Sequence, residues 1–185
     1  VLHSHLNNLN IASLHATMPI NFKTNTKESI ESLKNVVFKI KTNIRCKPNL
    51  LNKLGSISGE VIGGNLSILY SLVGSVSNIN TDGKILFIED LDEYLYHIDR
   101  MMISLKRNNK FKHLKGLIVG SMSNMNDNNV PFGKSAEEII LAHTKDYNFP
   151  ICFGFPSGHI ENNNAILFGL NSELKITSDE VLLFN

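Results

Sequence analysis

The sequence has no excess of charge of one sign and no long apolar run. Its 18 lysines and arginines nearly balance its 17 aspartates and glutamates, so the net charge is +1. Nucleic-acid binding depends on neutralising many phosphates, and we therefore expect no nucleic-acid partner. Apolar runs such as residues 85–88 are far shorter than the roughly 18 residues of a membrane span, and no charged-then-apolar leader opens the chain. We expect a soluble protein with no membrane partner and no secretion signal.

Cysteine is also scarce. Cys46 and Cys152 lie far apart in the sequence, and neither belongs to a C-x-x-C pair or has a histidine at the spacing of metal ligands. Neither a disulfide framework nor a zinc site is therefore indicated. We expect both cysteines to be reduced, buried thiols.

The length and composition are sufficient for a sizeable buried core. A chain of 185 residues, of which 42% are hydrophobic, can form one large unit or two small ones. Residues 46–56 contain Pro48, Asn49 and Gly55, which favour a connector. We therefore predict a boundary there, with residues 1–45 on one side and 57–185 on the other.

Hydrophobic periodicity predicts strands that alternate with helices. Helices are expected over 1–9, after Thr26, after Asn65, over 91–105 and over 136–143. Strands are expected at 11–14, 38–44, 59–62, 84–88, 117–120 and 150–155, with a terminal antiparallel group at 166–170, 173–176 and 180–184. This alternation is typical of an α/β fold.

Two carboxylates, Glu89 and Asp90, directly follow the strand over 84–88. The carboxyl ends of strands in open α/β sheets are where ligands bind, so both are candidates for function. Asp90 or Asp92 also fits the N-cap of the next helix, which is a structural role. Glu89 is the better functional candidate, because it ends a strand whose other residues are expected to be buried.

A loop bearing a histidine, Pro156-Ser157-Gly158-His159, follows the strand over 150–155. Glycine lets the chain turn sharply and present the imidazole as a general base. An imidazole exchanges protons near neutral pH. His97 is instead expected on a helix face, and solvent exposure is expected for His3, His5, His113 and His143.

The segment Gly63-Gly64-Asn65 lies at a strand-to-helix junction and leaves two interpretations open. Backbone N–H groups at such a junction can hold an anion, or the glycines form a tight turn and Asn65 caps the helix. Gly-Gly alone lacks the spacing of a dinucleotide fingerprint or a phosphate loop.

Glu89 and His159 suggest two members of a nucleophile–base–orienter set. A nucleophile to complete it is missing from the sequence. The motif Gly-x-Ser-x-Gly is absent, and Ser121, Ser123 and Ser157 lie in segments predicted to be polar loops.

Four segments, in this order, carry a resemblance to a known family. They are Gly-Glu-Val-Ile-Gly-Gly-Asn-Leu-Ser (59–67), Gly-Lys-Ile-Leu-Phe-Ile-Glu-Asp (83–90), Tyr-His-Ile-Asp-Arg-Met-Met (96–102) and Phe-Pro-Ser-Gly-His (155–159). The sequence resembles the LD-carboxypeptidases, which are cytoplasmic serine peptidases of bacterial murein recycling, and their relatives that inactivate microcin C. The segment Ser-Leu-His-Ala-Thr-Met-Pro (13–19) is similar to the family's segment after the nucleophile helix, where His-Gly-Pro-Met is commoner, and departs from it at Ala16 and Thr17.

The resemblance implies an α/β architecture of two domains. In the family, an N-terminal flavodoxin-like domain carries the serine in a Gly-x-Ser-Asp turn, and a C-terminal swivelling β/α domain carries the glutamate and the histidine. Glu89 and His159 are then the implied catalytic residues, with Glu93 as a competing carboxylate. The serine would stand just before Val1, so residues 1–45 would be a remnant of the N-terminal domain and the chain alone would be inactive.

The implied reaction is hydrolysis of the L,D-peptide bond that releases terminal D-alanine from a murein tetrapeptide in the cytoplasm. Neither a metal nor a cofactor is needed, the partner is the murein peptide, and the family's dimers make a homodimer an option. A microcin C-type peptidase and a non-catalytic peptide-binding module are the alternatives. The sequence assigns no role to His15 or Asn65, and Arg100 is expected to pair with a carboxylate as part of the structure.

Overall fold

The computed structural model describes residues 1–40 and 43–184 and has the mixed α/β class that the sequence predicts. Its helices are α1 (Leu2–Asn8), the 3-10 helix η1 (Pro19–Asn21), α2 (Lys27–Val37), α3 (Leu66–Ser71), α4 (Leu95–Arg107) and α5 (Ala136–Thr144). Its strands are β1 (Ser13–His15), β2 (Asn43–Cys46), β3 (Gly55–Asn65), β4 (Ile85–Leu91), β5 (Gly116–Ser123), β6 (Ile151–Cys152), β7 (Ile166–Phe168), β8 (Asn171–Ile176) and β9 (Val181–Phe184).

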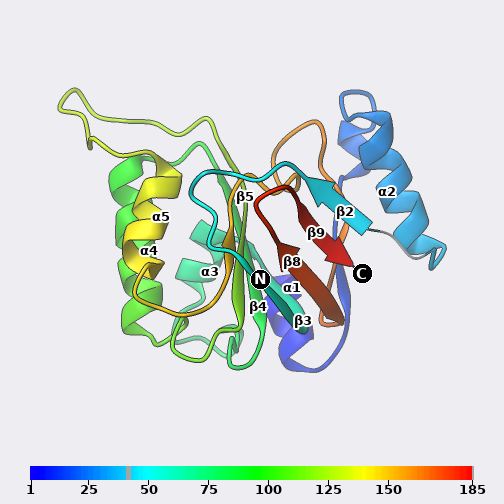
Figure 1. Ribbon diagram of the computed structural model, residues 1–185, viewed down its shortest axis with the longest axis horizontal. Coiled ribbons are helices and arrows are strands. Elements are labelled where there is room, and N and C mark those ends of the chain that lie inside the picture. Colours follow the sequence, from blue (N-terminus) through cyan, green and yellow to red (C-terminus); the bar gives the residue numbers. More distant parts are fainter. Residues whose placement is uncertain (41–42, 185) are drawn as a thin grey trace.

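The strands form a seven-stranded sheet in the order β2-β9-β8-β3-β4-β5-β6, of which Figure 1 labels all but β6. The strands β1 and β7 form a separate antiparallel pair. The strand β3 joins the two halves of the large sheet. Its residues 55–60 pair antiparallel with β8, whereas its residues 61–65 pair parallel with β4. The pairs β4–β5 and β5–β6 are also parallel, so one half of the sheet is parallel and the other antiparallel.

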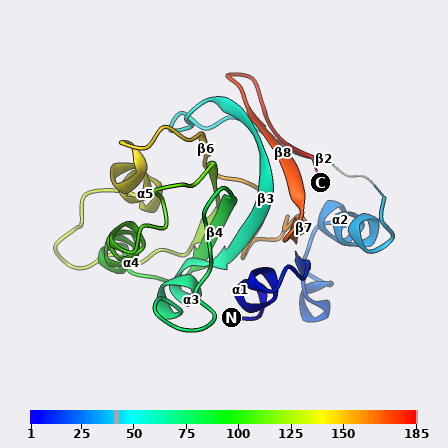
Figure 2. The same ribbon diagram turned by 90° about the horizontal axis from the view of Figure 1, so that it is seen from below.

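The parallel half of the sheet is buried on both faces. Figure 2 shows α3, α4 and α5 together on one side of it and α1 and α2 on the other. The first face packs against these three helices through Ile62, Leu86, Ile88, Leu117 and Val119. The second face packs against β7, β8 and β9 through Val61, Ile85, Phe87 and Ile118. Strands buried on both faces have the continuous apolar runs seen in this sequence.

Local sequence signals explain where several helices begin. The Thr26 hydroxyl accepts a hydrogen bond from the Ser29 N–H and so caps α2, as predicted. Ser135 and Glu138 form a reciprocal capping box at the start of α5. The apolar stripe of α4 is buried at Ile98, Met101, Met102 and Leu105, which confirms the predicted helix face.

The bounds of some predicted elements were wrong, and the strand predicted over 150–155 is only Ile151–Cys152. The half-exposed strand predicted over 38–44 is a four-residue strand over Asn43–Cys46. The N–H groups of residues 38–40 donate back to carbonyls at the end of α2 and so do not pair in a sheet, and residues 41–42 of the prediction lie outside the described part. The helix predicted over 91–105 begins at Leu95, since β4 extends to Leu91, and its N-cap residue Tyr94 makes no side-chain capping bond.

The start of the chain lies close to its end. The strand β1 pairs with β7, and β2 pairs with β9 from Asn43↔Phe184 to Cys46↔Val181. The residues before the predicted boundary at 46–56 therefore share sheets with the last part of the chain. The division into a remnant over 1–45 and a domain over 57–185 stays a prediction.

Candidate active site

Glu89 lies on β4, opposite Asn65 of β3, where the two parallel strands end. Its side chain is only 2% exposed. Burial raises the pKa of this carboxyl above its usual range, and the hydrogen bond and charge of His159 oppose that effect in part. The sequence predicted Glu89 at the end of its strand, and the structure places it two residues before that end.

His159 lies in the loop between β6 and β7, and the structure brings it to Glu89. The distance from His159 Nδ1 to Glu89 Oε2 is 2.7 Å. Because an ionised carboxylate only accepts hydrogen bonds, Nδ1 carries the proton in the neutral imidazole, and Nε2 is left with its lone pair. The His159 side chain is 47% exposed, so this nitrogen can meet a group that enters from outside.

Gly158 allows the loop to approach Glu89 closely. Its φ is 120°, and a Cβ at this position would lie 2.4 Å from Ser121 Oγ and 3.0 Å from Glu89 Oε2. Only glycine fits both the backbone angle and the space. The Gly158 N–H donates to Asn163 Oδ1 at 2.9 Å, and the Ser121 N–H donates to the Ser157 carbonyl at 2.9 Å, which fixes the loop against β5.

The N-terminal segment also holds this loop. The Thr26 N–H donates to the Glu161 carbonyl at 3.0 Å, and Ser29 Oγ donates to the Asn163 carbonyl at 2.7 Å. The Ala165 N–H donates to Ser32 Oγ at 2.9 Å. The start of α2 therefore helps to set the position of His159.

The sequence suggested Asp90 as a cap of α4, but the N-cap residue of that helix is Tyr94. The Asp90 carboxylate accepts hydrogen bonds from the Ser67 N–H at 2.9 Å and from Asn65 Nδ2 at 2.7 Å, so it serves the start of α3. The Asn65 side chain accepts from the Ile68 N–H and caps the same helix. This supports the capping interpretation of Asn65 over the anion-binding one.

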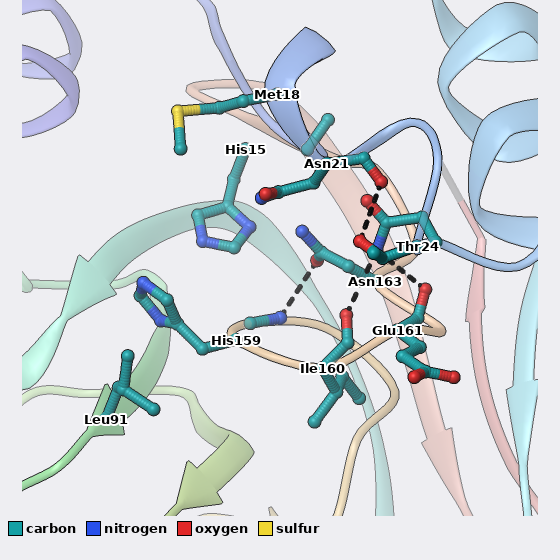
Figure 3. A pocket seen from close by; sticks show the side chains of 12 residues that line it. His15, Met18, Asn21, Thr24, Leu91, His159, Ile160, Glu161 and Asn163 are labelled. Atoms are coloured by element: carbon teal, nitrogen blue, oxygen red, sulfur yellow. Dashed lines mark hydrogen bonds between the residues drawn. The ribbon is translucent and has the colours of Figure 1, made fainter.

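An open pocket of about 550 Å³ lies beside His159 (Figure 3). It is lined by His15, Ala16, Met18, Asn21, Thr24, Asn25, Leu91, Gly158, His159, Ile160, Glu161 and Asn163. None of these lining residues is a lysine or an arginine, and most of the polar ones are amides, hydroxyls and imidazoles. The pocket walls come from the N-terminal segment, from the loop that bears His159 and from Leu91 at the end of β4.

His15 is the site residue to which sequence analysis gave no role. It lies on β1, and Figure 3 shows its ring facing that of His159 across the pocket. Burial, together with the charges of His3 and His159, lowers the pKa of His15 to about 4. A signal was present in the sequence, since the segment around His15 resembles a family segment, but the changes at Ala16 and Thr17 obscured it.

Other predicted candidates lie elsewhere or make different contacts. Glu93 accepts a hydrogen bond from His97 Nδ1 at 2.6 Å and does not reach His159. Arg100 lies over the Tyr96 ring at 5.3 Å, and no ion pair of Arg100 is found within the described ranges, so the predicted carboxylate pairing was wrong. His3 and His143 are half-buried where solvent exposure was expected, because they bond to Ser13 and Asp99.

Within residues 1–40 and 43–184, no hydroxyl or thiol is hydrogen-bonded to His159 Nε2. Cys152 is fully buried in β6, and burial raises its pKa, so it is not a thiolate nucleophile. No group of metal-ligating side chains was found in the part of the chain that the structure describes. In that same part, no helix has the length and apolarity required to cross a membrane.

Replacing Glu89 by glutamine is expected to raise the midpoint of thermal unfolding at neutral pH. The raised pKa means that the ionised carboxylate is less favourable in the folded state than in the unfolded state. Its cost is present above the folded-state pKa and vanishes below the unfolded-state pKa of about 4.3, where both states are protonated. The higher unfolding midpoint of the variant should therefore disappear as the pH falls from the folded-state pKa of Glu89 to its unfolded-state pKa.

Thermal unfolding of both proteins between about pH 4 and pH 8 checks this expectation. The matched control is Glu161→Gln, which removes an exposed carboxylate that lines the same pocket. A Glu89→Gln variant that unfolds at a lower temperature than the unchanged protein at pH 7 would contradict the sign of the effect.

Comparison with protein families decides the relationship of this chain to known proteins. A family model described as the LD-carboxypeptidase C-terminal domain matches residues 58–174. The chain belongs to the LD-carboxypeptidase family. This confirms the resemblance that the four sequence motifs indicate.

Several family members and solved structures resemble the chain. A probable murein peptide carboxypeptidase of Bacillus subtilis is 35% identical over 120 residues, which cover 65% of this chain and 38% of that protein. The microcin C7 self-immunity protein MccF of Escherichia coli is 40% identical over 68 residues, or 36% of this chain and 20% of that protein. The fold matches the crystal structure of muramoyltetrapeptide carboxypeptidase from Oxalobacter formigenes with a TM-score of 0.88 at 20% identity, over 99% of this chain and 64% of that one.

These coverages mean that the chain spans only part of the length of its relatives. It matches 38% of the Bacillus subtilis protein and 64% of the Oxalobacter formigenes structure. The fold class predicted from the sequence is confirmed by the structural match.

Proposed function

We propose that the intact protein is a serine-type LD-carboxypeptidase that releases terminal D-alanine from murein tetrapeptides in cytoplasmic peptidoglycan recycling. In this proposal, Glu89 and His159 are two members of a Ser-His-Glu triad, and the serine precedes Val1. The observation that carries the proposal is the 2.7 Å contact between His159 Nδ1 and a buried Glu89 carboxylate at the edge of an open pocket.

The contact geometry suits general acid–base catalysis. The serine hydroxyl would attack the carbonyl carbon of the L,D-peptide bond while His159 Nε2 takes its proton. The C–N bond then breaks, and His159 returns that proton to the leaving amine, which departs as D-alanine. A water molecule would hydrolyse the acyl-enzyme by the same route. Glu89 would hold the imidazole in the required tautomer and stabilise the imidazolium, so neither a metal nor a cofactor is required.

A second cavity supports a serine just before Val1. Val1, His15, Gly63, Gly64 and Glu89 are among the residues that line a space of about 230 Å³. Residues that precede Val1 would thus begin at a cavity that Glu89 also lines. In this proposal, residues 1–45 are the remaining part of the nucleophile domain and 57–185 form the C-terminal domain.

Two alternatives use the same pocket. The likeness to the microcin C7 self-immunity protein favours a peptidase of microcin C-type peptide nucleotides as the second candidate. The missing nucleophile within the described residues instead favours a module that binds peptides without cleaving them. A homodimer is compatible with each of these functions.

The proposal predicts that the protein as its gene encodes it releases D-alanine from a murein tetrapeptide, whereas the 185-residue chain does not. The isolated chain would lack both the nucleophile and the backbone N–H groups beside it, which form the oxyanion hole. Free D-alanine is measured after incubation of equal amounts of each protein with the tetrapeptide. The intact mass of the native protein, compared with 20.7 kDa, shows whether an additional domain is present.

Each other outcome decides against a part of the proposal. Release of D-alanine by the 185-residue chain would mean that the nucleophile lies within it. A native mass equal to that of the chain would favour the binding module. A full-length protein that cleaves a microcin C-type substrate and leaves the tetrapeptide intact would favour the second candidate.

A further inference from the structure

His15 faces His159 across the pocket, but the proposed triad does not use it. Its ring packs against both Phe87 and Phe168, with ring centroids 5.1 Å and 5.5 Å away, and these two rings also contact each other. This packing fixes the plane of the imidazole. The described residues provide no hydrogen-bond partner for its Nε2, whereas its Nδ1 lies 3.3 Å from Ser157 Oγ.

The hydrogen bonds around Ser157 determine which nitrogen of His15 carries the proton. Ser157 is fully buried, and its Oγ also lies 2.9 Å from the Asn164 carbonyl and 3.2 Å from Asn163 Oδ1. The Asn164 carbonyl can only accept. Asn163 Oδ1 is likewise identified as an acceptor, because the Gly158 N–H donates to it at 2.9 Å.

A hydroxyl has one proton, and here two acceptors already compete for it. If His15 Nδ1 were unprotonated, a third acceptor would face the same proton. Nδ1 must therefore donate to Ser157 Oγ, and His15 is the tautomer with hydrogen on Nδ1. Its Nε2 then carries a lone pair, which makes it a hydrogen-bond acceptor for a ligand in the pocket.

The surroundings keep His15 neutral at physiological pH. Burial lowers its pKa to about 4, and the charges of His3 and His159 add to the effect. The titratable groups nearest to it are these two histidines and Glu89, with which it lines a second cavity. The neutral Nε2 of His15 therefore suits a ligand group that donates a hydrogen bond. The pocket lining has no lysine or arginine that could bind a carboxylate of the ligand.

We infer that His15 is a substrate-binding residue whose Nε2 accepts a hydrogen bond from the N–H on the leaving-group side of the scissile bond. This inference rests on the proposed function, because His159 has to deliver its proton to that nitrogen and His15 faces His159. Ser157 is a positioning residue that acts through the tautomer of His15. The site therefore selects amide substrates by their N–H as well as by their shape.

The tautomer is tested by spectroscopy, without any assay of activity. The full-length protein is labelled with 15N-histidine, and the ring nitrogens are observed by NMR at pH 7 with and without D-alanine. His15 is expected to show a protonated Nδ1 and an unprotonated Nε2, and D-alanine should shift the Nε2 resonance. In Ser157→Ala the ring should become a mixture of tautomers. A protonated Nε2 in the unchanged protein would overturn the inference.

The substrate contact is tested with two peptides that differ in one group. One ends in D-alanine, and the other ends in D-lactate, whose ester oxygen replaces the N–H. His15→Phe keeps an aromatic ring against Phe87 and Phe168 but removes the acceptor. We expect this variant to lose about tenfold more kcat/KM with the amide than with the ester, as for one neutral hydrogen bond.

The matched control is His97→Phe, whose ring also contacts an aromatic side chain, Tyr70 at 5.9 Å, but does not line the pocket. This variant should change kcat/KM for the amide and for the ester by the same factor. Equal losses with amide and ester in His15→Phe, with the unchanged protein active, would overturn the inference alone. An unchanged protein that cleaves neither peptide would overturn the proposed function and this substrate contact with it, and the NMR result would still decide the tautomer.

Discussion

Replacing Glu89 by glutamine in the full-length protein is expected to lower kcat/KM for D-alanine release by about ten-thousand-fold. The glutamine amide can donate to His159 Nδ1 and so favours the tautomer with hydrogen on Nε2. That tautomer has no lone pair to take the proton of a hydroxyl. His159→Ala removes the base itself, and its loss should be of the same order.

The matched control for these variants is His143→Gln. His143 Nε2 lies 2.7 Å from Asp99 Oδ1, so this pair is also a histidine–carboxylate contact with the same distance as the proposed catalytic pair. It joins α5 to α4 and does not line the pocket. A loss in His143→Gln as large as that in Glu89→Gln would mean that the assay reports stability and not catalysis. Full activity of His159→Ala would exclude the proposed triad.

Replacing Gly63 by alanine is expected to reduce the free energy of unfolding by at least about 4 kcal/mol. A Cβ at this position would lie 1.9 Å from the Phe87 carbonyl oxygen and 2.7 Å from its carbon. These are backbone atoms of the neighbouring strand β4, so no side-chain rotation can relieve the overlap. The φ of Gly63 is also unfavourable, at 142°.

Gly64→Ala separates the two causes. Gly64 has nearly the same φ, 141°, but a Cβ there would meet nothing within 4 Å. This variant should lose only the cost of the backbone angle, about 1–3 kcal/mol. Urea unfolding of the 185-residue chain measures both. If the two variants were equally stable, the close approach of β3 and β4 at Phe87 would be wrong.

Much of the fold could be predicted because most of the local signals agree with the tertiary structure. The apolar stripe of α4 and the capping residue Thr26 predict their helices correctly. The strand over 38–44 was mispredicted because apolar and polar residues alternate there, as they do in a strand. The hydrogen bonds from the N–H groups of residues 38–40 back to the end of α2 leave no trace in that pattern. Asp90 was misassigned because its partner, the Ser67 N–H, is 23 positions away along the chain.

The site could be predicted only in part. Glu89 ends one apolar strand and His159 lies in the loop after another, and both are local features of the sequence. The order of the four motifs then indicated a family in which these two residues act together. Nothing local indicates that His15, 142 positions before Ser157, donates to its buried hydroxyl. The role of Ser157 depends on contacts of its hydroxyl with His15 Nδ1, Asn163 Oδ1 and the Asn164 carbonyl, and the contact with His15 forms only in the folded chain. No repeating pattern or fixed spacing of residues in the sequence predicts such a hydrogen-bond network.

The hydrogen bonds that join α2 to the His159 loop determine when the site can form during synthesis. Ser29 and Asn163, which are 134 positions apart, must meet before that loop is held in place. The parallel strands β3, β4 and β5 pair with neighbours much closer in sequence and can form earlier. A ribosome must therefore have synthesised the chain at least as far as Asn163 before α2 can hold this loop. A chain interrupted before Asn163 would have the residues of β3, β4 and β5 but could not form the hydrogen bonds that hold the His159 loop.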